Sequence, residues 1–353
     1  MSLRHLSAPR LRRSLLLTSL LLAGSFNVHA AQELLRQPVG KGAYEMAVGQ
    51  QENALWVATS QSRKTDKGGV VYRLDPQTLA VTQVIHNDLK PFGATLDNAN
   101  QTLWFGNSVD GAVTAIDAKS GEVKGRIVVE PRKRSESVKP LQPRELAVDE
   151  KTGTVYITGV GKESVVWVVD GKALTLKTTI ENTGNRATAL ALDSDARRLY
   201  TVTAEGELVT VDTATHRIDS RKKLVDDGKE HAFLNIALDK ANHRAFITDF
   251  KQPELLVVDL RDGKVLNTVA VPEALAVLFN PTRNEVYVTH RKTGTVSVID
   301  AKTLKVVKTI DTPPMPNSLA LSADGKTLYV SVKQISTREK EADKPDEVIR
   351  IAL

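Results

Sequence analysis

The hydrophobic positions of this chain fall into short strand-like runs that recur every 41 to 52 residues. A clear copy is Glu285-Val286-Tyr287-Val288-Thr289, in which an aromatic residue lies among β-branched residues. This composition is typical of a strand packed on both faces. Seven copies align on their aromatic residue: Trp56, Trp104, Tyr156, Tyr200, Phe246, Tyr287 and Tyr329. A period of this length, built from strands, indicates a propeller, a solenoid or an array.

Each copy repeats further signals at constant offsets from the aromatic residue. Apolar residues stand eight and ten positions before it, and a turn-forming residue usually stands between that segment and the aromatic strand. Downstream, a third strand ends in aspartate in six copies: Asp75, Asp117, Asp170, Asp212, Asp259 and Asp300. A fourth strand follows, without helical periodicity. The chain is therefore predicted to be all-β, a seven-bladed β-propeller of four-stranded antiparallel blades.

The seventh copy has one strand fewer than the others. After Tyr329 it contains one further strand, at residues 348–353, and residues 33–39 precede the first blade without belonging to it. Pairing of this N-terminal strand with the last blade would close the ring and remove two exposed strand edges. We therefore expect residues 31–353 to form a single propeller domain.

The first thirty residues predict a secretory signal peptide. Four arginines precede or open an uncharged apolar run at residues 15–26, and Val28-His29-Ala30 offers small residues for cleavage near Ala30. The run is short for a membrane span, so we expect no membrane insertion and an exported protein. We also expect a monomer. The chain has no cysteine, so the exported protein would depend on its core without disulfides.

Removal of this segment changes the charge balance. The whole chain has a net charge of +6, but without the four arginines of residues 1–30 it has 44 basic and 42 acidic residues. Binding of a polyanion must therefore be argued from where the charges lie rather than from their sum.

The repeat phrase resembles that of a known family. Tyr287-Val288-Thr289, followed by Val298-Ile299-Asp300, is similar to the YVTN-type β-propellers, and the resemblance extends through residues 40–46, 67–75 and 86–94 to the C-terminus. It implies a seven-bladed propeller in the periplasm that binds single-stranded DNA. The chain departs from the family phrase where asparagine is usual, since His290 and Val332 occupy or adjoin that position.

Propeller topology sorts the loops onto two faces. Loops between strands two and three, and between consecutive blades, share one face, and basic residues gather there. The longest insertion between blades, residues 130–142, is also the most basic, and unusual length suggests a functional loop. Tyr44, Phe92 and Phe233 could receive stacked bases. The predicted nucleic-acid-binding residues are Arg63, Lys64, Lys67, Phe92, Arg132, Lys133, Arg134, Arg144, Arg186, His290, Arg291 and Lys333.

Other interpretations remain open. Basic loops can be ordinary solvated surface, and the positive charge could be incidental to a protein-interaction scaffold in the envelope. Glu45, Glu145 and Asn235 share one position, eleven residues before the aromatic, and could form a cation site or hold water. A lactonase-like or metal-dependent hydrolase at the channel mouth is a third hypothesis. We expect no catalysis, metal or cofactor, because the histidines lack ligand spacing and no Gly-x-Ser-x-Gly, phosphate-loop or dinucleotide motif is present.

Overall fold

The recurring aromatic residues are buried, and each lies in the second strand of a four-stranded sheet. The computed structural model describes residues 34–61, 68–337 and 340–353, and the predicted signal peptide and its cleavage site lie outside these residues. Within the described residues, Leu34–Leu353 form one compact unit of seven sheets arranged as a ring. The predicted seven-bladed β-propeller is thus confirmed.

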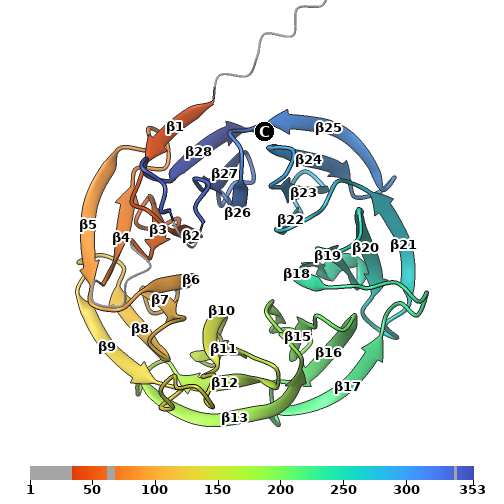
Figure 1. Cartoon of the computed structure of the whole chain (residues 1–353), viewed down its shortest axis with the longest axis horizontal. Helices are drawn as coiled ribbons and strands as arrows, with labels where there is room; N and C mark the ends of the chain where they lie inside the picture. The colour runs from red at the N-terminus through yellow and green to blue at the C-terminus, as the bar shows by residue number, and fades with distance from the viewer. Residues whose placement is uncertain (1–33, 62–67, 338–339) are drawn as a thin grey trace, which may run out of the picture. The chain divides into compact units, whose positions relative to one another are not determined.

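Four blades occupy the N-terminal part of the ring (Figure 1). Blade one contains β2 (Ala43–Gly49), β3 (Ala54–Thr59), β4 (Gly69–Leu74) and β5 (Val81–Asn87). Blade two contains β6 (Pro91–Asp97), β7 (Thr102–Asn107), β8 (Ala112–Asp117) and β9 (Val123–Val128). Blade three contains β10 (Gln142–Asp149), β11 (Thr154–Val160), β12 (Ser164–Asp170) and β13 (Thr175–Gly184). Blade four contains β14 (Ala191–Asp193), β15 (Arg198–Val202), β16 (Glu207–Asp212) and β17 (Arg217–Lys223).

The remaining three blades complete the circle. Blade five contains β18 (Phe233–Asp239), the 3-10 helix η1 (Lys240–Asn242), β19 (Arg244–Asp249), β20 (Glu254–Asp259) and β21 (Val265–Ala270). Blade six contains β22 (Val277–Asn280), β23 (Glu285–His290), β24 (Thr295–Asp300) and β25 (Lys305–Asp311). Blade seven contains β26 (Pro316–Leu321), β27 (Thr327–Val332), β28 (Glu347–Ala352) and β1 (Leu35–Pro38). Within the described residues, no helix has the length and apolar character of a membrane span.

Strand β1 closes the ring as predicted. It pairs antiparallel with β28, with Leu35 opposite Arg350 and Pro38 opposite Glu347. The next residue, Val39, is buried and its amide donates to the carbonyl oxygen of Asp346 at 2.9 Å. The observed strand is slightly shorter than the expected segment, residues 33–39.

The core lies between neighbouring blades, and each central aromatic packs against the next blade. Trp56 joins a cluster with Leu103 and Phe105 of blade two, and Tyr329 joins one with Leu74 of blade one. Full burial of one large apolar side chain stabilises the fold by roughly 1.5–3 kcal/mol. The prediction that these aromatic residues are core rather than ligand contacts is confirmed.

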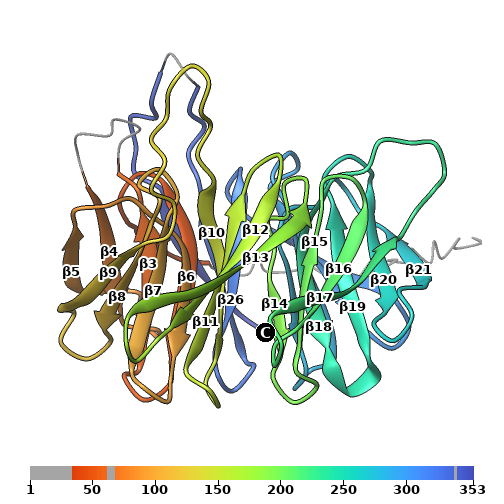
Figure 2. The same cartoon turned by 90° about the horizontal axis from the view of Figure 1, so that it is seen from below.

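The recurring aspartates form turns. Asp300, for example, accepts hydrogen bonds from the amides of Lys302 and Thr303, which lowers the pKa of its carboxyl group. Four residues after each aspartate the backbone is left-handed, for example at Leu304 with φ 57°. These turns lie on the face opposite the long loops (Figure 2). The repeated aspartate is therefore architectural, as predicted.

Candidate nucleic-acid interface

A β-bulge in the first strand directs side chains into the central channel. In five blades the pairing of the first and second strands shifts at the same place, for example between Ala43 and Met46 in blade one. Bulges re-aim side chains and are frequent beside functional sites. The two residues at this place in each blade stand twelve and eleven positions before the aromatic residue, and they supply most of the lining of a channel cavity of about 290 Å³.

Hydroxyl groups of the repeat phrase hold the bulges in place. In blade six, Thr289 accepts a hydrogen bond from the amide of Ala276 at 3.0 Å and donates one to the carbonyl oxygen of Asn317 in blade seven at 3.0 Å. The same double contact is made by Thr158, Thr248 and Ser331. The hydroxyl thus fixes the inner end of its own blade, which is the bulge in blades three, five and seven, and ties it to the next blade.

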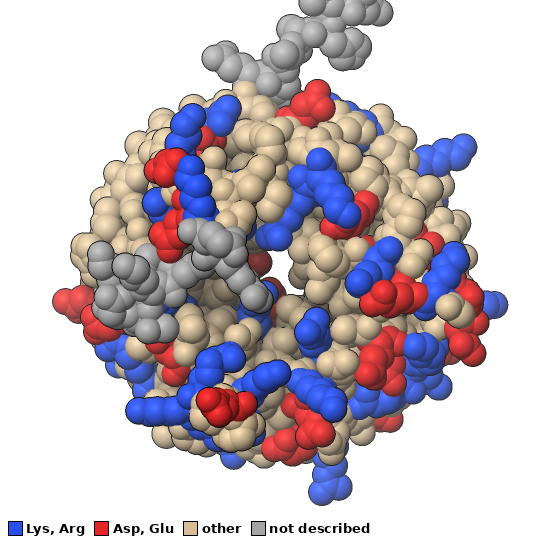
Figure 3. Space-filling view, in the orientation of Figure 1, with Lys and Arg blue, Asp and Glu red and all other residues tan. Residues whose placement is uncertain are grey.

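Three cations surround the channel mouth, and we call Arg144, Arg291 and Lys333 the collar. Arg144 lies in the β10 bulge, whereas Arg291 and Lys333 directly follow β23 and β27. All three line the channel cavity. Figure 3 shows lysine and arginine atoms around the central opening on the long-loop face.

Two of these cations stack on a pair of aromatic rings. The Lys333 ammonium lies 3.7 Å from the centre of the Tyr44 ring, the Tyr44 and Phe92 ring centres are 3.7 Å apart, and the Arg144 guanidinium carbon lies 3.6 Å from the centre of Phe92. These distances are those of cation–π contacts. Gly93 makes the arrangement possible, because a Cβ there would overlap the carbonyl oxygen of Arg144.

Burial alters the acid–base properties of the channel residues. Burial lowers the pKa of Arg144, with the nearby carboxylates opposing it, and burial also lowers the pKa of Arg291. Burial and the neighbouring Glu45 raise the pKa of Glu145 to about 8, against the effect of Arg144. Burial raises the pKa of Glu45 despite a hydrogen bond from the Ser318 hydroxyl.

The predicted interface residues divide into several groups. Phe92 and the collar line the channel together, as the shared face predicted. Lys133 and Arg134 are exposed on the loop between β9 and β10, and Arg186 is exposed between β13 and β14. Arg63, Lys64 and Lys67 lie outside the described residues.

Arg132 has a structural partner. Its guanidinium donates to both carboxylate oxygens of the buried Glu130, at 2.8 and 2.6 Å. Glu130 also accepts from the amide of Leu141 at 3.0 Å, across the base of the loop. Arg132 therefore helps to hold the loop closed, and its charge is already paired with that of Glu130 within the protein. This pairing could not be derived from the run of basic residues alone.

His290 is not available to a ligand on this face. Its side chain is fully buried, with Nδ1 3.2 Å from the carbonyl oxygen of Glu273 and Nε2 2.8 Å from the Ser297 hydroxyl. Burial lowers the pKa of His290, so the neutral ring donates from Nδ1 and accepts at Nε2. Its inclusion in the interface was wrong, because the strand register puts the residue near the face but turns the side chain inward. Phe233 is also fully buried and cannot receive a base.

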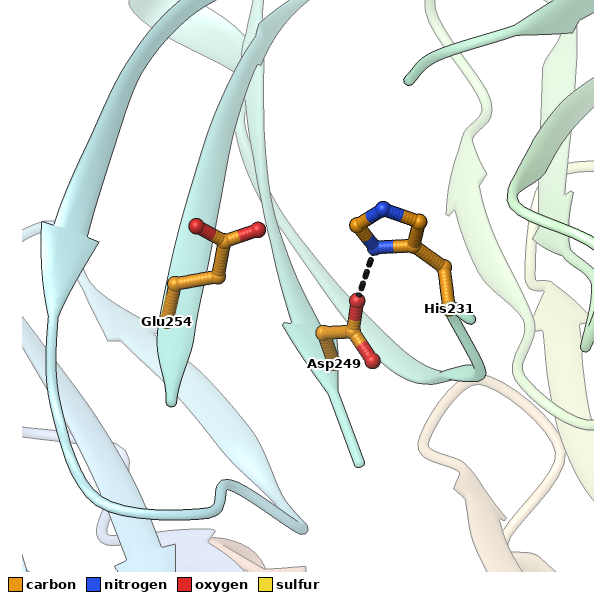
Figure 4. Close-up of side chains that lie close together, drawn as sticks. All are labelled: His231, Asp249 and Glu254. Atoms are coloured by element: carbon orange, nitrogen blue, oxygen red, sulfur yellow. Dashed lines mark hydrogen bonds and ion pairs between the residues drawn. The ribbon is translucent and has the colours of Figure 1, made fainter. Parts of the chain in front are cut away.

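A histidine cluster in blade five escaped the sequence analysis. The donor atoms of His231, Asp249 and Glu254 lie within 4.8 Å of one another (Figure 4). However, His231 Nδ1 lies 2.6 Å from Asp249 and its Nε2 lies 2.9 Å from Asp227, so both ring nitrogens already face carboxylates. Burial alone would lower the pKa of His231, but these two carboxylates raise it. The geometry suits an imidazolium held between two acids rather than a metal ligand.

Known proteins match this chain over its full length. YncE of Salmonella typhimurium (strain LT2) and YncE of Escherichia coli (strain K12) are each 70% identical to it over 353 residues, covering 100% of both chains. Antigen Lp49 of Leptospira interrogans is 29% identical over 181 residues, covering 48% of this chain and 38% of that protein.

Structural and family comparisons agree with the fold. Kuenenia stuttgartiensis hydrazine synthase superposes with a TM-score of 0.70 at 13% identity, covering 93% of this chain and 98% of that one, which shows a shared fold. The family described as YNCE-like beta-propeller matches residues 64–340. The chain therefore belongs to the YncE-like β-propeller family.

Proposed function

We propose that this protein is an exported, non-enzymatic β-propeller that binds single-stranded DNA or a similar polyanion at the collar. The observation that carries the proposal is the collar itself. Among the described residues, neither Arg144 nor Arg291 forms an ion pair, and Lys333 lies 3.7 Å from its nearest carboxylate, on Asp346. Lys333 also donates to the carbonyl oxygen of Ala43 at 3.2 Å, so the two arginines are the cations of the collar without an ion pair. Their charges beside one opening create a positive potential that attracts phosphates.

The shape of the site favours a single strand over a duplex. A duplex stays nearly straight over the dimensions of one protein domain, because its persistence length is about 50 nm. A single strand can bend toward the channel mouth and place successive phosphates on the collar, on Lys133 and Arg134, and on Arg186. The Tyr44 and Phe92 rings are covered by cations in this structure, so a stacked base would have to displace Lys333 or Arg144.

The proposal contains no catalytic step. The nearby His290 contacts the Ser297 hydroxyl, but both side chains are buried, so this pair is closed to a substrate at the collar. Export is part of the proposal and rests on the character of residues 1–30. A periplasmic location and a monomeric state are further parts of the proposal.

A titration with labelled DNA tests this function. The chain without its first thirty residues is titrated with an oligonucleotide of about 20 bases, as a single strand and as a duplex, at about 50 and 200 mM salt. We expect tighter binding of the single strand and a clear loss of affinity at the higher salt. Equal affinity for both forms, or binding that salt leaves unchanged, would contradict the proposal.

A further inference from the structure

Two carboxyl groups lie in the same cavity as the collar. Glu45 and Glu145 occupy the bulges of β2 and β10, one residue further along their strands than Tyr44 and Arg144. The first strands begin at the long-loop face, so these carboxyl groups lie deeper than the collar. Figure 3 shows acidic atoms deep within the central opening, reachable from that face.

The opposite charges in this cavity do not pair with one another. Among the described residues, the Arg144 guanidinium has its stacking contact with Phe92 but no hydrogen bond, and the Glu145 carboxyl group has none either. Arg291 donates to the Asn317 side chain, and Glu45 accepts from the Ser318 hydroxyl at 2.6 Å. The Nε atoms of Arg144 and Arg291 are buried without a hydrogen-bond partner, which is rare in proteins, so these unmet donors beside the two carboxyl groups point to a ligand.

We propose that the channel binds a small zwitterion of the amino-acid class. Its ammonium group lies against Glu45 and Glu145, and its carboxylate lies against Arg144 and Arg291. This is a second ligand, deeper in the channel than the polyanion, and it shares Arg144 and Arg291 of the collar with that polyanion. The cavity of about 290 Å³ is at the lower limit of small-molecule sites, which suits a molecule of this size.

Single-charge ligands fit the cavity less well. A bare metal ion at the carboxyl groups would face three nearby cations, and a simple anion at the collar would face two carboxyl groups. A zwitterion gives each group a partner of opposite sign, and charge-assisted hydrogen bonds are the strong ones. Because the cations lie nearer the mouth, the ligand enters with its ammonium group first.

Binding is coupled to a proton. The pKa of Glu145 is about 8, so the free protein holds this carboxyl group largely protonated at neutral pH. The charged groups around it are Glu45 on β2, Arg144 on β10, Arg291 after β23 and Lys333 after β27. An ammonium ion favours the ionised carboxylate, so binding releases a proton and the affinity rises as the pH increases toward about 8.

Calorimetric titration with each standard L-amino acid tests the inference. We expect at least one to bind, with release of a proton seen as a dependence of the heat on buffer ionisation. Its N-acetyl and carboxamide derivatives, which each lack one charge, should bind at least about tenfold more weakly. Glu145→Gln should weaken binding by a similar factor, whereas Lys119→Gln, on the opposite face, should leave it unchanged.

Several results would overturn the inference. These are no binding by any amino acid at millimolar concentration, equal binding of the blocked derivatives, or full binding by Glu145→Gln. Binding of nucleoside monophosphates in place of amino acids would also overturn it, in favour of a nucleotide pocket. The single-stranded DNA titration is a separate readout that Glu145→Gln should not impair, so this inference and the proposed function can fail independently.

Discussion

At the residue scale, the hydroxyl group two positions after the central aromatic connects the repeat to the channel. Thr289 is fully buried and bonds to the amide of Ala276, just before β22 of its own blade, and to a carbonyl oxygen of the next blade. A hydroxyl both accepts and donates, so one small side chain satisfies two backbone groups. The third residue of the Tyr-Val-Thr phrase thus shapes the channel without touching a ligand.

Thr289→Val tests this role because valine keeps the branched shape and removes the hydroxyl. The amide of Ala276 and the carbonyl oxygen of Asn317 would lose a partner, so we expect the free energy of unfolding to fall by about 1–3 kcal/mol. Thr309→Val, at an exposed position of β25 in the same blade, is the control and should change it by less than about 0.5 kcal/mol. Equal losses in urea unfolding would refute the role of the hydroxyl.

The imidazolium of blade five should make stability depend on pH. Folding raises the pKa of His231, so the protonated ring stabilises the folded state. This stabilisation is complete below pH 6.5, the ordinary pKa of histidine, and is lost as the pH rises through the pKa in the folded state. The hydrogen bond from His231 and that from the Lys229 amide lower the pKa of Asp227, which stabilises the fold above its ordinary value of 3.8. The stabilisation from Asp227 and that from His231 are therefore both present between about pH 3.8 and pH 6.5.

Asp227→Asn should therefore destabilise the protein more at about pH 5.5 than at about pH 8.5. Thermal unfolding at both values measures the difference, and Asp226→Asn, at the exposed neighbouring position, is the matched control. A loss that is the same at both values, or larger at the alkaline one, would show that His231 is not held as an imidazolium.

At the scale of elements, β1 joins the two ends of the described chain. It covers the edge of β28 with backbone hydrogen bonds, and the exposed Arg36 forms an ion pair with Glu347 at 2.7 Å. A ring that lacked β1 would leave blade seven with three strands and an open edge, which destabilises the sheet and favours association.

Deletion of residues 31–40 should lower the melting temperature by at least about 5 °C, because the backbone pairing and the burial of Val39 are lost. Arg36→Gln removes the exposed ion pair and keeps the strand, so it should have little effect. Thermal unfolding of the three proteins decides the point. If the shortened protein melts with the intact one, β1 does not close the ring.

Comparison of strands and bulges explains how far the sequence was informative. The seven aromatic residues predicted the blades, and the unassigned segment at residues 33–39 predicted the closing strand, because period and strand count are visible in a sequence. Neither Tyr44 nor Arg144 stands in a sequence pattern that predicts a bulge. A hydroxyl residue does recur two positions after four of the aromatic residues, at Thr158, Thr248, Thr289 and Ser331, and this recurrence could have indicated a shared role.

The arrangement of charges was only partly predictable. The register of the repeat placed Glu45, Glu145 and Asn235 together, and the loop topology placed the residues of the collar on one face; all of them line the channel cavity. The burial of His290 and the pairing of Arg132 with Glu130 depend on side-chain directions and on contacts that pattern alone does not specify. The sequence therefore predicted more side chains available to a ligand on this face than the structure provides.

At the scale of the whole molecule, the ring gathers residues distant in sequence around one opening. Arg144, Arg291 and Lys333 come from blades three, six and seven, and the carboxyl groups beneath them come from blades one and three. The molecule thus has a positive mouth and an acidic interior, although its basic and acidic residues nearly balance outside residues 1–30. Polyanion binding should depend on this local arrangement rather than on the net charge.

The most direct test compares two double variants that remove the same charge. Arg291→Gln/Lys333→Gln changes the collar, and Lys119→Gln/Lys172→Gln changes two exposed turns on the opposite face. For single-stranded DNA, we expect the collar variant to lose at least about tenfold in affinity and its logarithmic salt slope to fall by about 0.7 per lost phosphate contact. The control should match the wild type, and the melting of both variants is measured to show that each keeps its fold. If the collar variant binds as the control does, with the same salt slope, the collar is not the polyanion site.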